Sequence, residues 1–593
     1  MFSKVLVANR GEIAIRVMRT LEEMGISSVA VYSELDRDAP HARRADEAYL
    51  LGPGPANESY LVIEKIIDAA QKSGAEAIHP GYGFLAENAA FARACDEAGI
   101  TFIGPPAEAI DAMGSKTKAR ELMGAAGVPI VPGTTEPVET VEDARKIIAD
   151  SIGYPIAVKA AGGGGGKGFR VALDESELEK AFEGAAREGE KFFSDPTVYI
   201  ERYLPDPRHV EVQVLADRHG NVVHLFERDC SVQRRHQKLI EESPAPAVTP
   251  ELRERIGQIG IEAARAVGYH SAGTVEGLLQ DGEYYFLEMN TRVQVEHCVT
   301  EMVTGVDIVR EQIKVAAGEE LAFGQDDIQI RGHAIECRIN AEDASKNFAP
   351  APGRIESYRE PAGPGVRVDS GVEAGSEVSP MYDPMVAKLI VWDVDREAST
   401  RRMLRALHEY EVGGLKTLIP FHQALLQTEQ WRNGETCRDL IEDKDWLKSL
   451  AQPKPEAPAE GEEDEEKVER TYAVEVSGRR FDVKVIGPPP VANGAGPSAG
   501  AAALRKPPQR RERGGAGGGG AAGEIVSPLQ GTVLKVAVEK GADVEEGALI
   551  CVIEAMKMEN EITAPASGKV EELGVSEGGS IATGDTIAVI KAS

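Results

Sequence analysis

The segment Met556-Lys557-Met558 places one lysine between two bulky methionines near the C-terminus of the 593-residue chain. It lies at the join of an internal repeat, because residues 531–555 match residues 568–592 without a gap. Short Val/Ile runs punctuated by glycine predict strands, so the repeat predicts two similar β-halves with a tight turn between them. An isolated lysine in a turn is usually only a solvated charge. At the join of a repeat, however, its exposed amine could be loaded covalently with a cofactor.

The Met-Lys-Met motif resembles the biotin-attachment site of biotinyl carrier domains. Lipoyl domains share that fold but usually carry an acidic residue and an alanine beside their lysine, so the methionines favour biotin. The resemblance implies a biotinyl-lysine at Lys557, in a flattened β-barrel of the biotinyl/lipoyl type at residues 524–593. Lipoate on Lys557 would support the lipoyl alternative instead.

A run of five glycines, Gly162–Gly166, follows an apolar segment that is predicted to be a strand, Ile156–Lys159. Glycines leave the backbone free to wrap phosphates with its N–H groups. The run is not a Walker A loop, because Ala161 stands where that loop begins with glycine and Gly168 stands where it needs Ser or Thr. A flexible linker is the alternative, but the preceding strand with its terminal lysine favours a phosphate-covering lid.

Residues 274–290 are predicted to form a hairpin with a three-residue loop at 281–283, which would place Glu276 directly opposite Glu288. Two like charges facing each other across a hairpin destabilise it unless something positive lies between them. Together with Asn290, the two carboxylates offer hard oxygen ligands that suit Mg²⁺ shared with substrate phosphates. A solvent-exposed acidic face is the alternative to this metal site.

A lysine on a strand, a glycine-rich lid and a metal-binding hairpin, in this order, resemble the ATP-grasp fold. Longer motifs extend the resemblance to biotin carboxylase over roughly residues 1–447. These motifs are Asn9–Ala14, His79–Phe84, Glu227–Lys238, Glu288–His297 and Arg331–Arg338. With its carrier segment, the chain is similar to the α subunit of a bacterial acyl-CoA carboxylase.

The resemblance implies an α/β fold in five parts. They are a Rossmann-like biotin carboxylase N-terminal domain at 1–113, an ATP-grasp domain at 114–330, a carboxylase C-terminal domain at 331–447, a flexible linker at 448–523 and the carrier domain at 524–593. The linker is acidic, then rich in Pro, Gly and Ala, and contains a small predicted β-element near 472–486. A nicotinamide-binding start is excluded, because Asn9–Glu12 replaces the GxGxxG turn.

The activity that the resemblance implies is ATP-dependent carboxylation of biotin by bicarbonate through carboxyphosphate. Nucleotide binding would fall to Lys116, Lys159, Gly165, Gly166, Glu201, Leu204, His209, His236, Glu276 and Glu288. Glu276, Glu288 and Asn290 would hold Mg²⁺ or Mn²⁺, which neutralises charge on the transferring phosphoryl group.

The resemblance also assigns the carboxylation step. The bicarbonate-binding residues would be Lys238, Arg292, Gln294 and Val295. The planar guanidinium of Arg292 suits a carboxylate-like anion, and Glu296 would be the general base for bicarbonate. Arg338 would stabilise the enolate of biotin, and Tyr82 would contact biotin. Lys167 and Phe169 depart from the commonest lid residues, and Cys298 stands where the family usually has proline.

The formal net charge of −31 argues against nucleic acid and anionic membranes as principal partners. No uninterrupted apolar stretch reaches the length of a membrane span, and the first residues lack a signal-peptide layout. The six cysteines show neither CxxC nor zinc-site spacing. We therefore expect reduced thiols in a cytoplasmic protein.

No part of the chain is large enough for a carboxyltransferase, so the carboxyl group is expected to pass to a separate carboxyltransferase β subunit. That complex would be an acetyl-, propionyl- or other acyl-CoA carboxylase, with a biotin-protein ligase and further copies of the chain as partners. A different ATP-grasp ligase, such as a carbamoyl-phosphate or amino-acid ligase, is the enzymatic alternative, but it leaves Lys557 unexplained. A regulatory binding protein with a decayed site would have lost a metal or base residue, and none is lost.

Overall fold

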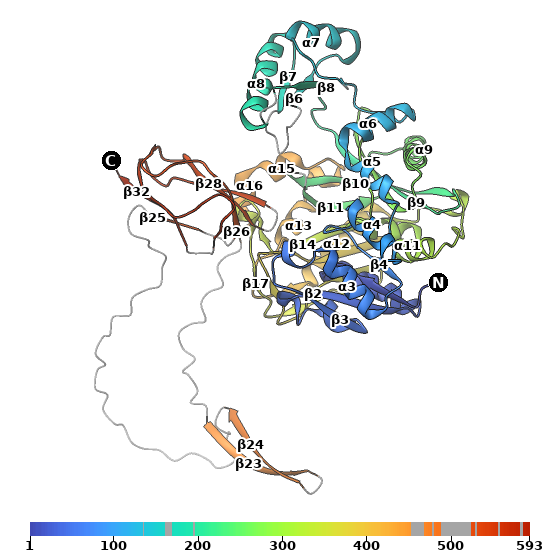
Figure 1. Cartoon of the computed structure of the whole chain (residues 1–593), viewed down its shortest axis with the longest axis vertical. Helices are drawn as coiled ribbons and strands as arrows, with labels where there is room; N and C mark the ends of the chain where they lie inside the picture. The colour runs from blue at the N-terminus through green and yellow to red at the C-terminus, as the bar shows by residue number, and fades with distance from the viewer. Residues whose placement is uncertain are drawn as a thin grey trace. The chain divides into compact units, whose positions relative to one another are not determined.

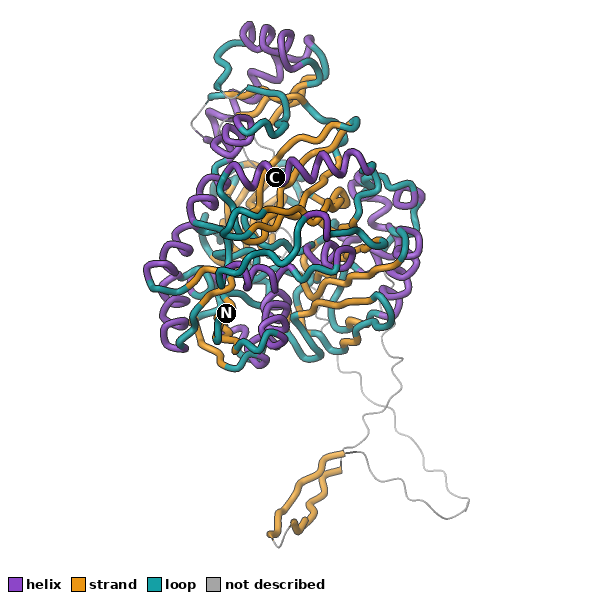
Figure 2. Tube along the Cα trace, turned by 90° about the vertical axis from the view of Figure 1, so that its right-hand side faces the viewer, coloured by secondary structure: helices purple, strands orange, loops and turns teal. Residues whose placement is uncertain are grey.

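The computed structural model of the chain describes residues 1–134, 136–160, 169–193, 196–235, 237–451, 468–476, 479–487, 524–527, 531–555, 558–581 and 585–592 (Figure 1). Residues 451–524 form a unit separate from the rest of the chain. In the described part of residues 1–451, helices flank the strands on both sides of the view in Figure 2.

The first hundred residues form a parallel sheet with the strand order β3-β2-β1-β4-β5, which confirms the predicted α/β start. Its elements are β1 (Lys4–Val7), α1 (Gly11–Glu23), β2 (Ser27–Ser33), α2 (Pro40–Arg44), β3 (Glu47–Gly52), α3 (Ile63–Ser73), β4 (Ala77–His79), α4 (Ala89–Glu97) and β5 (Thr101–Phe102). Carboxyl ends of parallel strands meet at one edge, so the loops after β1 and β4 are neighbours. Asn9 Nδ2 joins them by donating to the carbonyl oxygens of Pro80 at 2.7 Å and Tyr82 at 2.8 Å.

A small antiparallel sheet of order β7-β6-β8 follows in the chain, packed with two helices (Figure 1). The elements of this region are α5 (Ala107–Gly114), α6 (Lys116–Ala125), α7 (Val141–Ile147), β6 (Ile156–Ala160), β7 (Phe169–Ala172), α8 (Glu175–Phe193) and β8 (Val198–Arg202). The predicted strand ending at Lys159 is β6. The glycine run predicted as a lid lies outside the described residues.

The centre of the carboxylase region is an eight-stranded antiparallel sheet of order β13-β12-β9-β10-β11-β14-β21-β19. The strands are β9 (Arg208–Ala216), β10 (Val222–Arg234), β11 (Gln237–Ser243), β12 (Ser271–Gln280), β13 (Glu283–Asn290), β14 (His333–Asn340), β19 (Val366–Ser370) and β21 (Met385–Asp393). Because β11 pairs with β14, the sheet continues across the predicted boundary at residue 330.

Alternation along β9 decides which face of this sheet is apolar. Val210, Val212 and Val214 pack against Ile256 and Ile259 of helix α9 (Pro250–Ala266) in one buried cluster. The intervening side chains therefore point to the other face, because successive residues of a strand alternate sides. That second face carries the polar residues His209, Glu211 and Gln213, all of them buried.

The remaining elements of residues 1–451 pack around this sheet. The helices are α10 (His297–Thr304), α11 (Ile308–Ala316), α12 (Arg396–Glu409), α13 (Ile419–Leu425), α14 (Glu429–Arg432), α15 (Arg438–Glu442) and α16 (Lys444–Ser449). Short strand pairs are β15 (Glu342–Asp343) with β16 (Ala349–Pro350), β17 (Gly353–Arg354) with β20 (Glu377–Val378), and β18 (Tyr358–Arg359) with β22 (Glu411–Val412). Val17 of α1, Ile313 of α11 and Leu215 of β9 share one buried cluster, which fixes the N-terminal part on the large sheet.

The predicted hairpin is β12–β13, and Glu276 does face Glu288. The predicted three-residue loop is wrong, since Gln280 pairs with Glu283 and only Asp281-Gly282 connects the strands. Both turn residues have positive φ, 54° and 79°, as a two-residue hairpin turn requires. A bulge at Leu287 shifts the register by one residue and restores the facing glutamates.

The carrier segment consists of two four-stranded sheets of equivalent order, β25-β32-β30-β27 and β29-β28-β26-β31. The strands are β25 (Glu524–Val526), β26 (Gly531–Val536), β27 (Asp543–Val544), β28 (Leu549–Ala555), β29 (Met558–Thr563), β30 (Gly568–Leu573), β31 (Ser580–Ile581) and β32 (Thr586–Ala592). Strands β30, β31 and β32 each begin 37 residues after β26, β27 and β28. The repeat predicted from sequence is therefore a repeat of structure.

A separate antiparallel hairpin, β23 (Val468–Val476) with β24 (Arg479–Gly487), contains the β-element predicted near 472–486 and extends it at both ends. Within the predicted linker 448–523, residues 452–467, 477–478 and 488–523 lie outside the described residues, and helix α16 (Lys444–Ser449) runs past its predicted start.

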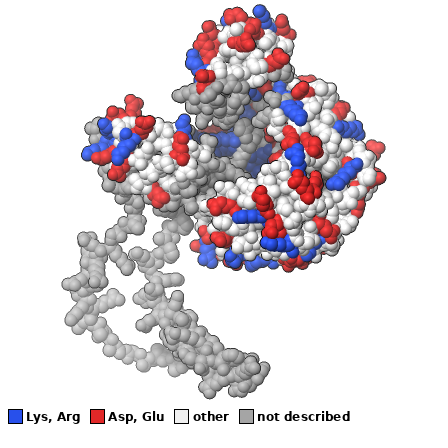
Figure 3. All heavy atoms as spheres, in the orientation of Figure 1, with Lys and Arg blue, Asp and Glu red and all other residues white. Residues whose placement is uncertain are grey.

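Among the helices of the described residues, none combines the length and apolar character that a membrane crossing requires. The six cysteines are buried free thiols, as their spacing predicts. On the face drawn in Figure 3, acidic and basic side chains of the described residues are interspersed, so that face presents no continuous basic surface to nucleic acid.

Gly277→Ala is expected to destabilise the protein, because the new Cβ would overlap the ring of the fully buried Tyr284. The overlap should cost about 1–3 kcal/mol of unfolding free energy and lower the melting temperature of the full chain. Gly124→Ala in α6 is the matched control, since its Cβ would meet only Ile130 Cδ1 at 3.8 Å. The control should melt at or above the wild-type temperature. Equal melting of all three proteins would contradict this packing.

Candidate active site

Four charged residues stand side by side across the polar face of the large sheet. Glu288 on β13 faces Glu276 on β12, which faces Glu211 on β9, which faces Arg228 on β10. Residues paired in this way project from the same face of a sheet. Glu211 and Arg228 are completely buried, and Glu276 is 6% exposed. Three carboxylates in one row repel one another, so this arrangement requires cations.

Lys238 on β11 supplies the main cation. Its Nζ lies 2.6 Å from Glu211 Oε2, 2.9 Å from Glu276 Oε1 and 2.5 Å from Glu296 Oε1. Burial disfavours the charged ammonium, yet Glu211 and Glu296 hold the pKa of Lys238 well above its usual value. Burial likewise disfavours the carboxylate of Glu276, but Lys238 brings its pKa below the usual value. Glu211, Glu276 and Lys238 are therefore charged at neutral pH.

Arg228 completes the polar face from the other side. Its guanidinium makes five hydrogen bonds, the full donor capacity of that group. The acceptors are Glu211 at 2.7 Å, Gln213 at 2.8 Å, Thr300 at 3.0 Å, Thr274 at 3.2 Å and Gln294 at 2.7 Å. Gln294 in turn donates to Glu276 Oε1 at 2.7 Å. Arg228 thereby fixes the predicted bicarbonate residue Gln294 against the predicted metal ligand Glu276.

His209, a predicted nucleotide residue, lies beside the same carboxylates, with Nε2 3.0 Å from Glu276 Oε2 and 3.7 Å from Glu211 Oε2. Burial lowers the pKa of His209, but the neighbouring carboxylates of Glu211 and Glu276 outweigh it and raise the pKa to about 9. These three residues bring their ligand atoms within 4.8 Å of one another. At neutral pH the imidazole is therefore a cation beside these carboxylates.

The predicted metal ligands form one edge of this group. Glu276 and Glu288 face each other, and Asn290 follows on the same face of β13. Asn290 is buried, its Oδ1 accepts from Arg292 at 2.8 Å, and its Nδ2 has no hydrogen-bond partner. Two carboxylates and an amide oxygen on one face are the hard donor set that suits Mg²⁺. The residues present therefore fit the predicted ion.

Glu296, the predicted base, lies between two cations. Its Oε1 accepts from Lys238, and its Oε2 accepts from Arg338 at 3.1 Å. Burial raises the pKa of Glu296, but Lys238 and then Arg338 bring it below the usual value. The carboxylate is therefore ionised and able to accept a proton. Arg338 itself is held by Glu241, whose Oε1 accepts from its Nε at 2.6 Å.

Arg292, Gln294, Val295 and Glu296 belong to one segment between β13 and α10. Glu87 anchors the start of that segment, since its Oε1 accepts from the Thr291 N–H at 3.0 Å and its Oε2 accepts from Arg292 Nε at 2.8 Å. The carbonyl oxygen of Val295 accepts from Lys388 at 2.9 Å. Consecutive chain positions thus bring four of the predicted residues together.

Lys159 and Glu201 form an ion pair on β6 and β8 of the small sheet, where Arg120 also binds Glu201 at 3.2 Å. Leu204 follows β8, and Tyr82 follows β4 with its hydroxyl bonded to Glu12. Several predicted site residues cannot be placed. The side chain of Lys116, together with Gly165, Gly166, His236 and Lys557, lies outside the described residues.

Four residues of the site escaped the sequence prediction, namely Glu87, Glu211, Arg228 and Glu241. A pattern for one of them is present in the chain, because histidine, glutamate and glutamine alternate with valines along 209–214. Such alternation predicts a strand with one polar face. Arg228 stands inside the motif Glu227–Lys238. The sequence alone gives no role to Glu87 or Glu241.

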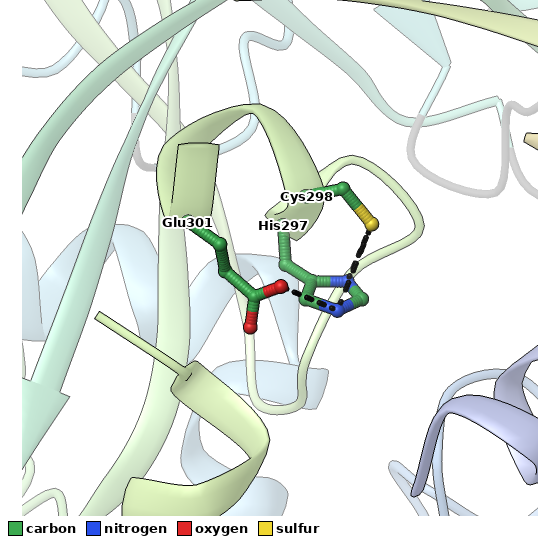
Figure 4. Close-up of side chains that lie close together, drawn as sticks. All are labelled: His297, Cys298 and Glu301. Atoms are coloured by element: carbon green, nitrogen blue, oxygen red, sulfur yellow. Dashed lines mark hydrogen bonds and ion pairs between the residues drawn. The ribbon is translucent and has the colours of Figure 1, made fainter. Parts of the chain in front are cut away.

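A second group of possible ligands lies at the start of α10, where His297, Cys298 and Glu301 come together (Figure 4). The carboxylate of Glu301 is already used, since Oε1 accepts from Arg16 at 2.9 Å and Oε2 accepts from Arg367 at 2.7 Å. Burial lowers the pKa of His297 to about 3 and raises the pKa of Cys298 well above its usual value. Two arginines in contact with the carboxylate make this group a buried ion-pair network, and we assign no metal to it.

Known protein families match the chain in four places. The matches are the N-terminal domain of biotin carboxylase at 1–110, the ATP-binding domain of the carbamoyl-phosphate synthase L chain at 115–323, the biotin carboxylase C-terminal domain at 336–443 and the biotin-requiring enzyme domain at 522–590. A pyruvate carboxylase subunit of Methanothermobacter thermautotrophicus is 57% identical over 443 residues, which cover 75% of this chain and 90% of that protein. The chain belongs to the biotin carboxylase family.

Two further relatives extend the comparison. The biotin-dependent acyl-coenzyme A carboxylase alpha3 subunit of Mycobacterium leprae is 47% identical over 562 residues, 94% of this chain and 93% of that protein. The biotin carboxylase domain of 2-oxoglutarate carboxylase from Hydrogenobacter thermophilus, solved as a dimer with MgADP, ADP and bicarbonate, is 51% identical with a TM-score of 0.68. It covers 75% of this chain, which covers 99% of it.

These matches confirm the predicted fold class of this biotin carboxylase and its fusion to a carrier domain. The central family is named for carbamoyl-phosphate synthase, the enzymatic alternative left open above. The matches before and after it, and the one at the C-terminus, are to biotin enzymes. The chain is therefore a biotin carboxylase with a biotin carrier domain in the same polypeptide.

The protonated His209 should make this biotin carboxylase less stable at high pH. Its folded-state pKa of about 9 lies above the unfolded value, so its contribution is complete below pH ~6.5 and disappears as the pH rises through about 9. The difference in unfolding free energy between the wild type and His209→Gln should shrink by about 2 kcal/mol between pH 7 and pH 9.5. Urea unfolding at both pH values measures it.

The matched control for this pH series is His422→Gln. Burial lowers the pKa of His422 to about 4, so the imidazole is neutral in both states over this range and the difference should stay constant. A difference that stays constant for His209→Gln as well would show that the imidazole is not protonated in the folded protein.

Proposed function

We propose that this chain carboxylates the biotin on its own Lys557 and delivers the carboxyl group to a separate carboxyltransferase subunit of an acyl-CoA carboxylase. The observation that carries the proposal is Glu296, an ionised carboxylate between the ammonium of Lys238 and the guanidinium of Arg338. It lies beside a row of carboxylates suited to Mg²⁺ and in the same segment as Arg292. A base, anion-binding groups and a metal site are the three requirements of bicarbonate activation.

Nucleotide binding is assigned to both sides of the site. Lys159 and Glu201 on the small sheet, and Leu204 just after it, would hold ATP from one side. His209, Glu276 and Glu288 on the large sheet would face its phosphates. Lys116, Gly165, Gly166 and His236 complete the proposed set. Magnesium or manganese on Glu276, Glu288 and Asn290 would neutralise charge on the phosphoryl group in transit. The protonated His209 would add a further positive charge toward those phosphates.

Bicarbonate would bind to Lys238, Arg292, Gln294 and the backbone of Val295. An anion that takes donors from Lys238 relieves Glu296 of the cation that depresses its pKa most. Glu296 then regains basicity at the moment it must remove the bicarbonate proton. The resulting nucleophile would attack the γ-phosphate of ATP, break its bond to the β-phosphate oxygen and release ADP, forming carboxyphosphate, which breaks down to CO₂ and phosphate.

Arg338 would stabilise the negative charge that develops on the ureido oxygen of biotin when its N–H proton is removed, before the nitrogen attacks CO₂. Glu241 supports this role, because its bond to Arg338 Nε fixes the plane of the guanidinium. The phosphate released from carboxyphosphate would take the ureido proton. Tyr82 is proposed to contact biotin from the loop after β4.

The acyl-CoA assignment is supported by the Mycobacterium leprae relative, which extends over both the carboxylase and the carrier segments. A 2-oxo acid is the second candidate acceptor, because the relative named as a pyruvate carboxylase subunit is 57% identical over the carboxylase region. The dimer of the Hydrogenobacter thermophilus structure supports a dimer of this chain. A biotin-protein ligase is the proposed modifying partner, and a cytoplasmic location stays a prediction.

Lys557→Arg should abolish carboxylation of the chain while leaving carboxylation of added free biotin unchanged, because arginine keeps the charge but cannot be biotinylated. Transfer of radiolabelled bicarbonate to protein and to free biotin, measured side by side, distinguishes the two reactions. Loss of both would overturn the carrier assignment of Lys557.

Glu296→Gln and Glu296→Ala should both collapse bicarbonate-dependent ATP cleavage, by at least about 100-fold, with nucleotide affinity little changed. Glutamine keeps the shape of the side chain and one acceptor oxygen, but it cannot take a proton. A loss of activity in Glu296→Gln therefore reports the loss of a general base and not a change in packing. Steady-state phosphate release with and without bicarbonate measures the effect. Full activity in Glu296→Gln would eliminate Glu296 as the base.

A further inference from the structure

Lys388 is a completely buried cation that the proposed reaction does not use. It stands on β21 among apolar residues and directly opposite Arg338 on β14. Two cations facing each other across strands repel, so both need compensation. Lys388 Nζ lies 3.3 Å from Glu12 Oε1 and 3.9 Å from Asp369 Oδ2, which supply negative charge. A fully buried lysine far from water requires a reason to be retained.

The hydrogen bonds of Lys388 point to that reason. Its Nζ donates to the carbonyl oxygen of Val295 at 2.9 Å. That carbonyl belongs to the peptide group between Val295 and Glu296, so fixing it fixes the backbone that carries the proposed base. A charged donor to a carbonyl is stronger than a neutral one and holds the peptide in one orientation. Lys388 thus acts on the bicarbonate-binding segment without reaching the reacting atoms.

The other partner of Lys388 leads to the biotin side of the site. Glu12 Oε1 also accepts a hydrogen bond from the hydroxyl of Tyr82, and the ring of Tyr82 lies 5.9 Å from Lys388 Nζ. The second oxygen of Glu12 is buried without a hydrogen-bond partner. The polar contacts of the Glu12 carboxylate to Tyr82 and Lys388 are therefore made by Oε1. A continuous path runs from Tyr82 through Glu12 and Lys388 to the Val295 carbonyl.

We propose that Glu12 and Lys388 are positioning residues that set the biotin-contacting Tyr82 and the bicarbonate-binding segment 292–296 in one fixed relation. The proposal rests on the proposed function, which places biotin at Tyr82 and bicarbonate at Arg292–Glu296. The path joins α1, the loop after β4, β21 and the segment before α10, four elements that are distant in the chain. Only when both substrates sit in register can the carboxyl group pass from carboxyphosphate to biotin.

Cys298 offers a control beside this path. Its Sγ lies 3.2 Å from Lys388 Nζ and 3.3 Å from Asp369 Oδ2, but it contacts neither Glu12 nor Tyr82 among the described contacts. The sulfur also lies 3.8 Å from the Val295 carbonyl oxygen, but a thiol is only a weak donor and acceptor, so its contacts add little to the ion pair and the hydrogen bonds of the path. Cys298→Ala should leave the kinetics within about twofold of wild type.

The test is a double-mutant cycle on the full biotinylated chain. Glu12→Gln keeps the size of the side chain and an acceptor for Tyr82, but it removes the charge that pairs with Lys388. Glu12→Gln and Tyr82→Phe should each lower kcat/KM for free biotin by about tenfold, with nucleotide affinity unchanged. The double variant should have a kcat/KM no lower than that of the less active single variant, because both changes interrupt one path. The proposal would be overturned if the decreases in kcat/KM were additive. It would also be overturned if each decrease were accounted for by destabilisation, seen as a lower melting temperature.

Lys388→Met tests the other end of the path and should raise KM for bicarbonate by about tenfold relative to Cys298→Ala. If Lys388→Met does not fold, the cycle of Glu12→Gln with Tyr82→Phe decides the matter alone. Wild-type kinetics in the folded Glu12→Gln and Lys388→Met variants would overturn the positioning role while leaving the proposed function intact. A wild-type chain without bicarbonate-dependent ATP cleavage would instead refute the proposed function itself.

Discussion

The ammonium group of Lys238 holds three buried carboxylates, Glu211, Glu276 and Glu296, within hydrogen-bond distance of one nitrogen. Each carboxylate would be expelled from the core, or protonated, without that cation. Because Lys238 keeps them ionised, the same cluster can offer oxygen ligands to a metal on one side and a base to bicarbonate on the other. In the proposed mechanism, binding and proton transfer therefore depend on the same ion pairs, and bicarbonate competes with Glu296 for Lys238.

The large sheet is what makes such a cluster possible in structural terms. Its antiparallel pairing puts Glu276, Glu211 and Arg228 in register on three adjacent strands. The opposite face is filled by valines packed against α9, so the charged face is stabilised by burial that it does not itself provide. The pairing of β11 with β14 then brings Lys238 and Arg338, from two predicted domains, to the two oxygens of Glu296. The charged residues of the site therefore come from several strands of the sheet and not from one hairpin.

Features of the site that are local in the chain could be predicted from the sequence. The duplicated carrier halves follow from one repeat, and the strand with Lys159 follows from one apolar run. The facing of Glu276 and Glu288 was predicted correctly from a wrong loop, because the two-residue Asp281-Gly282 turn and the bulge at Leu287 cancel. Contacts between distant strands could not be predicted in this way. The partners of Glu211 and Glu241 became known only once strand order brought these residues to Lys238 and Arg338, and Glu87 reaches Arg292 from the loop after β4.

The most direct test of the account is transfer of radiolabelled bicarbonate to the full chain, after biotinylation has been verified by intact mass. If the cluster around Lys238 activates bicarbonate and the chain carries its own biotin, label will appear on the protein only with ATP and Mg²⁺. Avidin will then prevent it. Biotinylated protein that takes up no label under these conditions would contradict the account and assign the site to a different ATP-dependent reaction.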